Sequence, residues 1–163
     1  MENTALIEVE DAEIAAFRAL PKGEQIASFI AELLASTPDH IEFEVKHSFA
    51  PGMYIREMFI PKGSVVVGKV HRAECLNICP MGDIEIVSAA GDIRVTAPFT
   101  AVSAPGTQKI GFALEDTVWV NVFRTDETDI EKLEAELVYS DAEAFALLDP
   151  AGKYFKVKEL ECQ

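Results

Sequence analysis

Two residues with chemically useful side chains, Lys69 and His71, lie in the short β-rich run SVVVGKVH. Side chains of an extended strand alternate between its two faces, so Lys69 and His71 are expected to project from the same face. An imidazole can bind a metal or act as a general acid or base, whereas an ammonium group attracts anions. The pair therefore indicates a site for an anionic molecule or part of a catalytic site.

Three residues close together in the chain, His71, Glu74 and Cys75, carry side chains that bind transition metals. Zinc usually takes at least three protein ligands, and His47 from an earlier run could come close enough to contribute. An altered site for a divalent transition metal stays open. A hydrogen-bonded pocket histidine accounts better for so few donors, so we favour no metal and no other cofactor. Cys75 and Cys79 have no second pair of ligands and are expected to be buried thiols.

Between about residues 41 and 123, short β-rich runs alternate with turn signals such as Pro51-Gly52 and Pro105-Gly106. Many short strands at this spacing predict a sandwich or barrel. Residues 82–86 and 91–95 are expected to form a hairpin whose turn lies at 89–92. The predicted strands are IEFEVKHSF, MYIREMFI, SVVVGKVH, DIEIVSA, DIRVTA, TAVSA, KIGFAL and TVWVNVF.

Helical patterns flank these strands on both sides. Residues 10–36 contain two of them, and the second has an apolar stripe that predicts a helix docked on the barrel or on a second copy. A further helix is expected from about Asp129 to Val138, and the apolar 140–163 segment should fold back. We therefore expect one domain, with a helical segment at 1–40, a β-barrel at 41–124 and a C-terminal extension at 125–163. The stripe comprises Ile26, Phe29, Ile30, Leu33 and Leu34.

The stretch from Gly63 to Gly82 resembles the first motif of the cupin superfamily, G-x5-H-x-H-x3-E-x6-G, with Lys69, His71 and Cys75 at the ligand positions. Residues 104–113 resemble the second motif, P-x-G-x2-H-x3-N, with lysine and alanine at the histidine and asparagine positions. The resemblance implies a mainly β fold, a cupin-type double-stranded β-helix (jelly-roll barrel) with flanking N- and C-terminal helices. The family metal site of three histidines and a glutamate is mostly missing.

The register of this resemblance brings Lys69 and His71 into the barrel mouth, where Lys109 of the second motif would join them. A partly buried pair of lysines needs an anionic ligand or an internal carboxylate, and both outcomes stay open. Glu57, Glu74 and Glu115 are the candidate internal partners. Further candidates for ligand contact are Arg56, Arg94, Asn77 and Trp119.

The charge balance limits the partners. With 28 acidic and 14 basic residues the chain carries a formal charge of -14, which repels nucleic acid and anionic membranes. Three cysteines without a secretory signal indicate a reducing compartment, so a cytoplasmic location is expected. We expect no membrane span and a homodimer.

The chain is also similar to small cupin-like proteins of bacteriophage genomes, which implies a phage setting. We therefore expect a non-catalytic protein that binds a small anionic molecule in its barrel, for ligand sequestration or sensing. One alternative is a cupin dioxygenase, isomerase or lyase, with an altered metal site or with acid/base catalysis by His71. The other is a structural or assembly protein of a phage whose barrel is packed solid.

Overall fold

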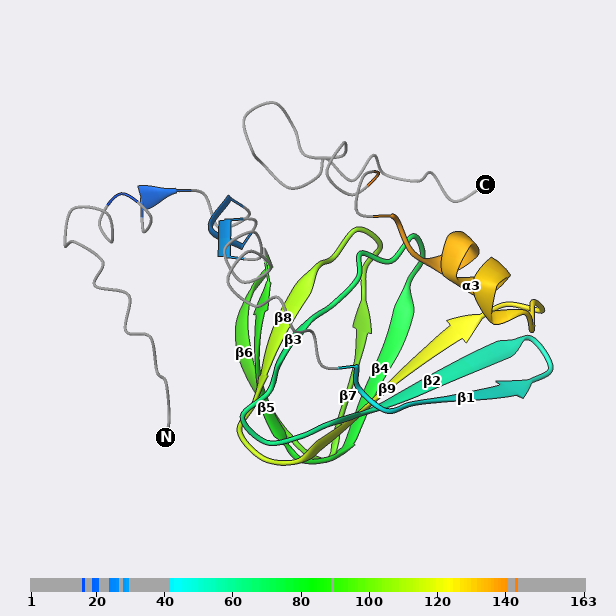
Figure 1. Cartoon of the computed structure of the whole chain (residues 1–163), viewed down its shortest axis with the longest axis horizontal. Helices are drawn as coiled ribbons and strands as arrows, with labels where there is room; N and C mark the ends of the chain where they lie inside the picture. Colours follow the sequence, from blue (N-terminus) through cyan, green and yellow to red (C-terminus); the bar gives the residue numbers. More distant parts are fainter. Residues whose placement is uncertain are drawn as a thin grey trace.

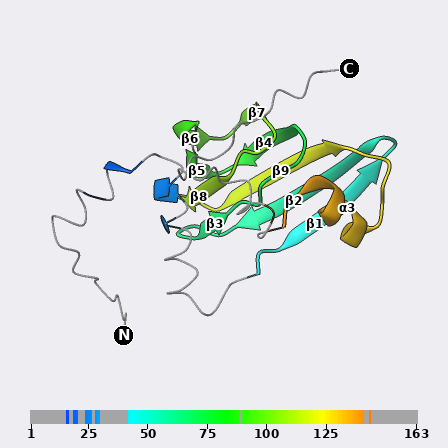
Figure 2. The same cartoon turned by 90° about the horizontal axis from the view of Figure 1, so that it is seen from above.

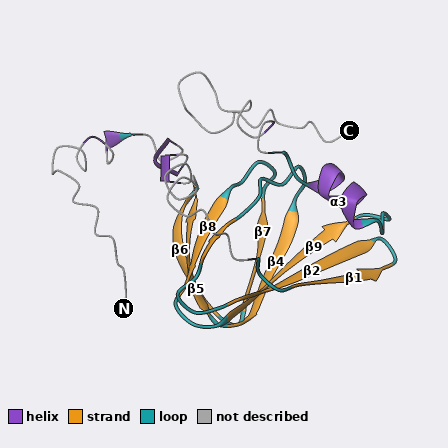
Figure 3. Ribbon diagram, in the orientation of Figure 1, coloured by secondary structure: helices purple, strands orange, loops and turns teal. Residues whose placement is uncertain are grey.

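The computed structural model describes residues 42–88 and 90–140, together with Ala16, Ala19, Leu20, Glu24, Gln25, Ile26, Ser28, Phe29 and Glu143. Most of these residues lie in strands (Figures 1 and 3). The elements are β1 (Val45–Ala50), β2 (Met53–Ile60), β3 (Val65–Val67), β4 (Cys75–Met81), β5 (Asp83–Ser88), β6 (Gly91–Thr96), β7 (Phe99–Ser103), β8 (Lys109–Ala113), β9 (Thr117–Arg124) and α3 (Ile130–Leu137).

The strands form two sheets. One has five strands in the order β1-β2-β9-β4-β7, and the other has four in the order β3-β8-β5-β6. All the pairings are antiparallel. A core cluster with residues from both sheets lies between them, so the expected mainly β jelly-roll barrel is confirmed. The cluster contains Met58, Ile60, Cys79, Ile84, Ile86, Val95, Ala113 and Trp119.

A second, smaller cluster lies under α3. Leu133 and Leu137 of the helix pack against Tyr54, Cys75 and Phe123 of the five-stranded sheet. Seen from above, the helix lies over the part of that sheet formed by β1, β2 and β9 (Figure 2). Its apolar face thus covers one end of the barrel.

The predicted C-terminal helix is confirmed, and its start has a simple cause. The Asp129 carboxylate accepts hydrogen bonds from the backbone N–H groups of Glu131 and Lys132, which satisfies donors that have no partner within the helix. After the helix, Tyr139 N donates to Val70 O over 2.9 Å and Arg72 N donates to Leu137 O over 2.8 Å. These bonds tie the end of α3 to the segment that follows β3.

The side chain of Arg72 strengthens this connection. Its Nε donates to Val138 O over 2.9 Å, its guanidinium lies 4.3 Å from the centre of the Tyr139 ring, and it forms an ion pair with Glu143. His71 and Val138 form an isolated β-bridge at the same point. The helix is therefore held over the barrel end by backbone and side-chain contacts together.

Two strand predictions need correction. The run SVVVGKVH was expected to be one strand, but β3 ends at Val67 and the chain then leaves the sheet, so regular alternation does not orient Lys69 and His71. The strand Cys75–Met81 was not predicted, although it pairs with both β7 and β9. It is buried within the sheet, so polar and apolar side chains do not alternate along it.

The hairpin prediction is confirmed, since Ser88 of β5 pairs with Gly91 of β6. Of the expected N-terminal stripe, Ile26 is buried and Phe29 is exposed within helical backbone, while Ile30, Leu33 and Leu34 lie outside the described residues. The 144–163 segment also lies outside them. None of the helices in the described residues has the length and apolar character needed to cross a bilayer.

The two glycines that frame the first motif are both needed for their backbone conformation. Gly63 has φ of 79° and Gly82 has φ of 108°, values that side-chain-bearing residues rarely adopt. They differ in their surroundings. A Cβ atom on Gly63 would meet nothing within 4 Å, whereas one on Gly82 would lie 2.7 Å from Asp116 O and against Thr117.

This difference yields a matched pair of variants. We expect Gly63→Ala to lower the free energy of unfolding by about 1–2 kcal/mol, the cost of a left-handed backbone. Gly82→Ala should lower it by clearly more, because the methyl group also collides with the backbone that leads into β9. Urea denaturation of both variants measures the two losses. Equal losses would contradict the packing role of Gly82.

Candidate functional site

A cavity of about 500 Å³ lies between the two sheets, and α3 contributes to its wall. Its lining is mostly apolar, with polar side chains concentrated on one region. The polar and charged lining residues are His47, Arg56, Lys69, His71, Asn77, Thr107, Lys109, Asn121 and Glu134. The apolar ones include Tyr54, Met58, Ile60, Ile84, Ile86, Trp119, Phe123, Leu133 and Leu137.

Four of the polar residues form a row across the five-stranded sheet. His47 pairs with Arg56, Arg56 with Asn121, and Asn121 with Asn77, so the row runs across β1, β2, β9 and β4. Neighbouring residues on the same face of each strand are two positions away and are mainly apolar or aromatic. Strand register alone therefore places one polar line in an otherwise apolar wall.

Lys109 comes from the opposite sheet and completes this site. Its Nζ donates to Ser103 Oγ in a short contact and to Asn77 Oδ1 over 3.3 Å. Asn121 Nδ2 donates to Asn77 Oδ1 over 3.0 Å and lies 3.3 Å from Cys75 Sγ. Asn77 Nδ2 in turn donates to Ser103 Oγ over 2.7 Å. We call Lys109, Ser103, Asn77, Asn121 and Cys75 the Lys109 network.

No carboxylate takes part in this network. Burial lowers the pKa of Lys109 below the usual value for lysine, an effect that the nearby Cys75 side chain partly offsets. Burial likewise raises the pKa of the Cys75 thiol, although the hydrogen bond from Asn121 and the charge of Lys109 act in the opposite direction. Both shifts have the same origin, because removal from water disfavours whichever form is charged.

His71 lies beside the network, with its ring edge against the Phe123 ring at a centroid separation of 5.0 Å. Burial is the main reason that its pKa falls from 6.5 to about 4, and the positive charges of Lys109 and Arg56 lower it further. At neutral pH the imidazole is therefore uncharged. It can donate and accept hydrogen bonds but adds no third charge to the two nearby cations.

An aromatic group lies under α3 next to His71. The Tyr54 ring stacks on those of His47, Phe49 and Phe123, and its hydroxyl lies 2.7 Å from His47 Nδ1. Burial raises the pKa of Tyr54, the charge of Arg56 lowers it, and the charge of Glu134 raises it. Arg56 and Glu134 therefore both act electrostatically at the Tyr54 hydroxyl.

The residues present do not fit the metal site that the resemblance to cupins implied. Within the described residues no group of three or more histidine, cysteine, aspartate or glutamate side chains comes together. His71, Glu74 and Cys75 are thus not assembled as ligands. Glu74 is exposed, and Cys75 is a buried thiol whose pKa is raised. Lysines occupy two of the former ligand positions, and an ammonium group cannot coordinate a cation.

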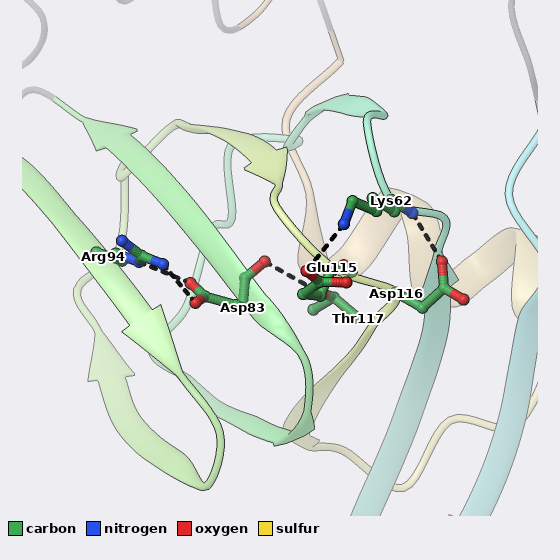
Figure 4. Close-up of polar contacts among 6 residues, drawn as sticks. All are labelled: Lys62, Asp83, Arg94, Glu115, Asp116 and Thr117. Atoms are coloured by element: carbon green, nitrogen blue, oxygen red, sulfur yellow. Dashed lines mark hydrogen bonds and ion pairs between the residues drawn. The ribbon is translucent and has the colours of Figure 1, made fainter.

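Six of the seven expected ligand-binding residues line the cavity. They are Lys69, His71, Lys109, Arg56, Asn77 and Trp119. The seventh, Arg94, was expected to join them and does not. It lies on β6 and forms a bidentate pair with Asp83, at 3.0 and 2.8 Å, on the surface (Figure 4).

The three carboxylates expected as internal partners of the lysines do not contact Lys109. Glu115 instead pairs with Lys62 over 2.9 Å, and Asp116 accepts a hydrogen bond from Lys62 N (Figure 4). Glu57 alternates with Arg56 and Met58, which both line the cavity, so it belongs to the other face of β2. Among the described lining residues, Glu134 of α3 is the only carboxylate.

Sequence reasoning missed two participants, Ser103 and Glu134. Each lies in a predicted strand or helix, but their roles depend on cross-strand register and on where α3 docks. One signal was present in the sequence. The spacing of Cys75, Asn77 and Cys79 at every second position predicts a common face if the segment is a strand.

No protein-family model and no curated protein sequence matches the chain. Solved structures do match it. Ectoine synthase from P. lautus superposes with a TM-score of 0.50 at 17% identity, covering 62% of this chain and 77% of that one. KdgF from Halomonas sp. has a TM-score of 0.47 at 18% identity, covering 56% and 88%.

A Cupin 2 conserved barrel domain protein from Salinispora arenicola has a TM-score of 0.45 at 14% identity, with 52% of this chain and 76% of that one covered. Sequence identities this low support a similarity of fold and no similarity of function. The two antiparallel sheets, their strand order and the superposition on ectoine synthase together show that the chain has the cupin-type double-stranded β-helix fold.

Proposed function

We propose that this protein binds a small anionic molecule with an apolar body in its barrel. The observation that carries the proposal is the charge of the cavity wall. Arg56 and Lys109 line the cavity and contact no carboxylate within the described residues, and Glu134 is the one carboxylate of the described wall. A carboxylate or phosphate group would neutralise the cations, while the remaining wall would contact apolar parts of the ligand.

The position of Lys109 supports the same conclusion. A partly buried ammonium group is costly to desolvate, and neutral oxygens compensate for this less well than a carboxylate does. Its partners here are the neutral oxygens of Ser103 and Asn77. Within the described residues Arg56 also has no carboxylate partner, and its guanidinium lies 4.0 Å from Met58 Sδ. An anion placed between the two would provide the missing counter-charge.

The cavity and its lining residues also argue against the structural-protein and enzyme alternatives. A phage structural protein with a solidly packed barrel would have no space of about 500 Å³ between its sheets. A metal-dependent cupin enzyme would need a ligand set that these residues do not assemble. Metal-free acid/base chemistry by His71 would rest on a weak base, because its pKa lies near 4. Non-catalytic binding fits the geometry better.

The proposal extends to the biological role, origin, oligomeric state and location of the protein. A pocket that binds without catalysis would suit sequestration or sensing of a small anionic metabolite, and the resemblance to phage proteins motivates a phage origin. Exposed apolar side chains of the five-stranded sheet, including Phe59, Met81 and Val102, offer surface for a homodimer. A cytoplasmic location is consistent with free buried thiols at Cys75 and Cys79.

Binding should stabilise the fold increasingly as the ligand concentration rises. We expect Tm to rise with added ligand for some members of a panel of nucleotides, sugar phosphates and organic acids, because a ligand that binds only the folded state stabilises it by mass action. Arg56→Met and Lys109→Met should each weaken the response. Thermal melts of the wild type and the variants measure this.

Arg94→Met is the matched control, since Arg94 is also a strand arginine but lies outside the cavity. It should keep the full response to ligand. A wild type that responds to no anion in the panel, or an equal loss of response in Arg94→Met and Arg56→Met, would contradict binding at this site.

The uncharged state of His71 makes stability depend on pH. Its folded pKa is about 4 and its usual value is 6.5. Between pH 6.5 and pH 4 the imidazole takes up a proton in the unfolded chain but not in the folded protein, which favours unfolding. The folded protein is therefore most stable with respect to this group above pH 6.5 and loses stability as the pH falls towards 4. From pH 7 to pH 5 we expect a loss of about 2 kcal/mol from this group. Urea denaturation of the wild type and of His71→Gln at both pH values measures it.

The paired carboxylates titrate in a different range. Arg72 and Ser140 hold the pKa of Glu143 at about 2, and Arg94 lowers that of Asp83. The stability that these two ion pairs contribute is lost only when the pH falls below the usual pKa of a carboxyl group. They therefore do not affect the comparison of the wild type with His71→Gln between pH 7 and pH 5. The same pH dependence in the wild type and His71→Gln would show that His71 is not the group responsible.

The metal alternative has a direct test of its own. Because lysines occupy two former ligand positions and repel a divalent cation, we expect well under one equivalent of transition metal per chain in protein purified without chelator. Elemental analysis of the purified protein measures this. A stoichiometric metal that disappears in His71→Ala would instead favour an enzyme with an altered metal site.

A further inference from the structure

The Lys109 amine has a hydrogen-bonding environment that suits its neutral form. A neutral amine has two N–H donors and one lone pair, whereas an ammonium group has three donors and no lone pair. Two side-chain acceptors contact Nζ, namely Ser103 Oγ and Asn77 Oδ1. They account for both donors of the neutral form. The same two acceptors also fit the ammonium form, and it is after loss of one proton that the amine has a lone pair for a molecule in the cavity that Lys109 lines.

The electrostatic environment of Lys109 also favours its neutral form. No carboxylate contacts Lys109 in the described part of the chain, and the charge of Arg56 and the ring of His71 lie close enough to interact electrostatically with each other. Burial lowers the pKa of Lys109 and so increases the fraction of neutral amine at neutral pH. A lysine amine that is desolvated in a largely apolar pocket is a usual setting for a lysine that acts as a nucleophile.

We propose that Lys109 forms a Schiff base with a small oxo acid bound in the cavity. This rests on the proposed function, because the acid group is held as the anion and the Arg56 guanidinium, which lines the same cavity, is its partner. The amine then faces the carbonyl carbon. Sequestration of an oxo acid would in this way include a reversible covalent bond.

The chemical step balances without a cofactor or an oxidant. The Lys109 nitrogen lone pair attacks the carbonyl carbon, and the C=O π electrons move to oxygen, which takes up a proton as the nitrogen releases one. The resulting carbinolamine loses water as the C=N bond forms. Hydrolysis reverses the step, so bound acid is released unchanged.

The wall of the cavity indicates the class of acid. Apolar and aromatic side chains, among them Met58, Ile84 and Trp119, surround the polar region. A 2-oxo acid with an aryl side chain places its carboxylate and carbonyl on adjacent carbons and its ring against that wall. Phenylpyruvate has this form, and phenyllactate is its matched control because it carries a hydroxyl in place of the carbonyl.

The experiment traps the adduct by reduction. The full-length protein is incubated with phenylpyruvate and sodium cyanoborohydride, which delivers hydride to the C=N bond, and is analysed by intact mass spectrometry and peptide mapping. We expect one addition per chain, with the mass of the acid less one oxygen atom, located at Lys109 in preference to the exposed Lys62 and Lys69. Phenyllactate should give no addition.

Two variants locate the reactive amine. Lys109→Arg keeps the charge but has no nucleophilic amine at neutral pH, so it should lose the addition. Lys62→Arg changes a surface lysine that pairs with Glu115 and should keep it. If Lys109→Arg does not fold, the peptide map of the wild type decides the question by itself.

The remaining outcomes separate this inference from the proposed function. If both acids raise Tm and neither adds covalently, Lys109 binds the anion only as a cation, and the Schiff base is overturned while the binding function stands. Additions spread evenly over the surface lysines also overturn it. If there is no addition and no rise in Tm with either acid, the inference fails, and the melts with the wider anion panel decide the proposed function independently.

Discussion

The contact of Lys109 with Asn77 and Ser103 joins the two sheets across the inside of the barrel. It is made by a basic group from β8 and neutral oxygens from β4 and β7, with no carboxylate among them. An apolar pair at this place would hold the sheets together at lower desolvation cost. The charge is therefore better explained by what enters the cavity than by what stabilises the fold.

Stability comes from the apolar clusters on either side of the polar row. One fills the space between the sheets around Ile60 and Ile84, and the other lies under α3 around Leu133 and Leu137. Each buries large aliphatic side chains almost completely, and a buried Leu or Ile side chain contributes roughly 1.5–3 kcal/mol. The polar row lies between the clusters and contacts the second one, because Asn121 lies against Cys75 and His47 against Tyr54.

Much of the fold could be predicted from the sequence, since turn glycines and prolines mark the ends of most strands. The hairpin at Ser88 and Gly91 and the cap at Asp129 are local and were correct. The strand at Cys75–Met81 was missed because its burial alternates but its residue types do not: the buried face carries Cys75, Asn77 and Cys79, and apolar residues stand on the other face. Arg94 was misplaced because one residue of register decides whether a strand side chain faces the cavity or the solvent. Asn121 and Ser103 depend on pairing between distant strands, which no local pattern encodes.

The overall charge and the cavity charge have opposite signs. The chain carries a formal charge of -14, while the described wall of the cavity has three cationic side chains and one carboxylate. At a distance the negative protein repels an anion, so long-range steering cannot explain its capture. Beyond about 8–10 Å from the surface, physiological salt screens that repulsion, and inside the cavity the nearby cations act with little screening. Selection among anions must therefore come from short-range contacts at Arg56 and Lys109 and from the fit of the apolar wall.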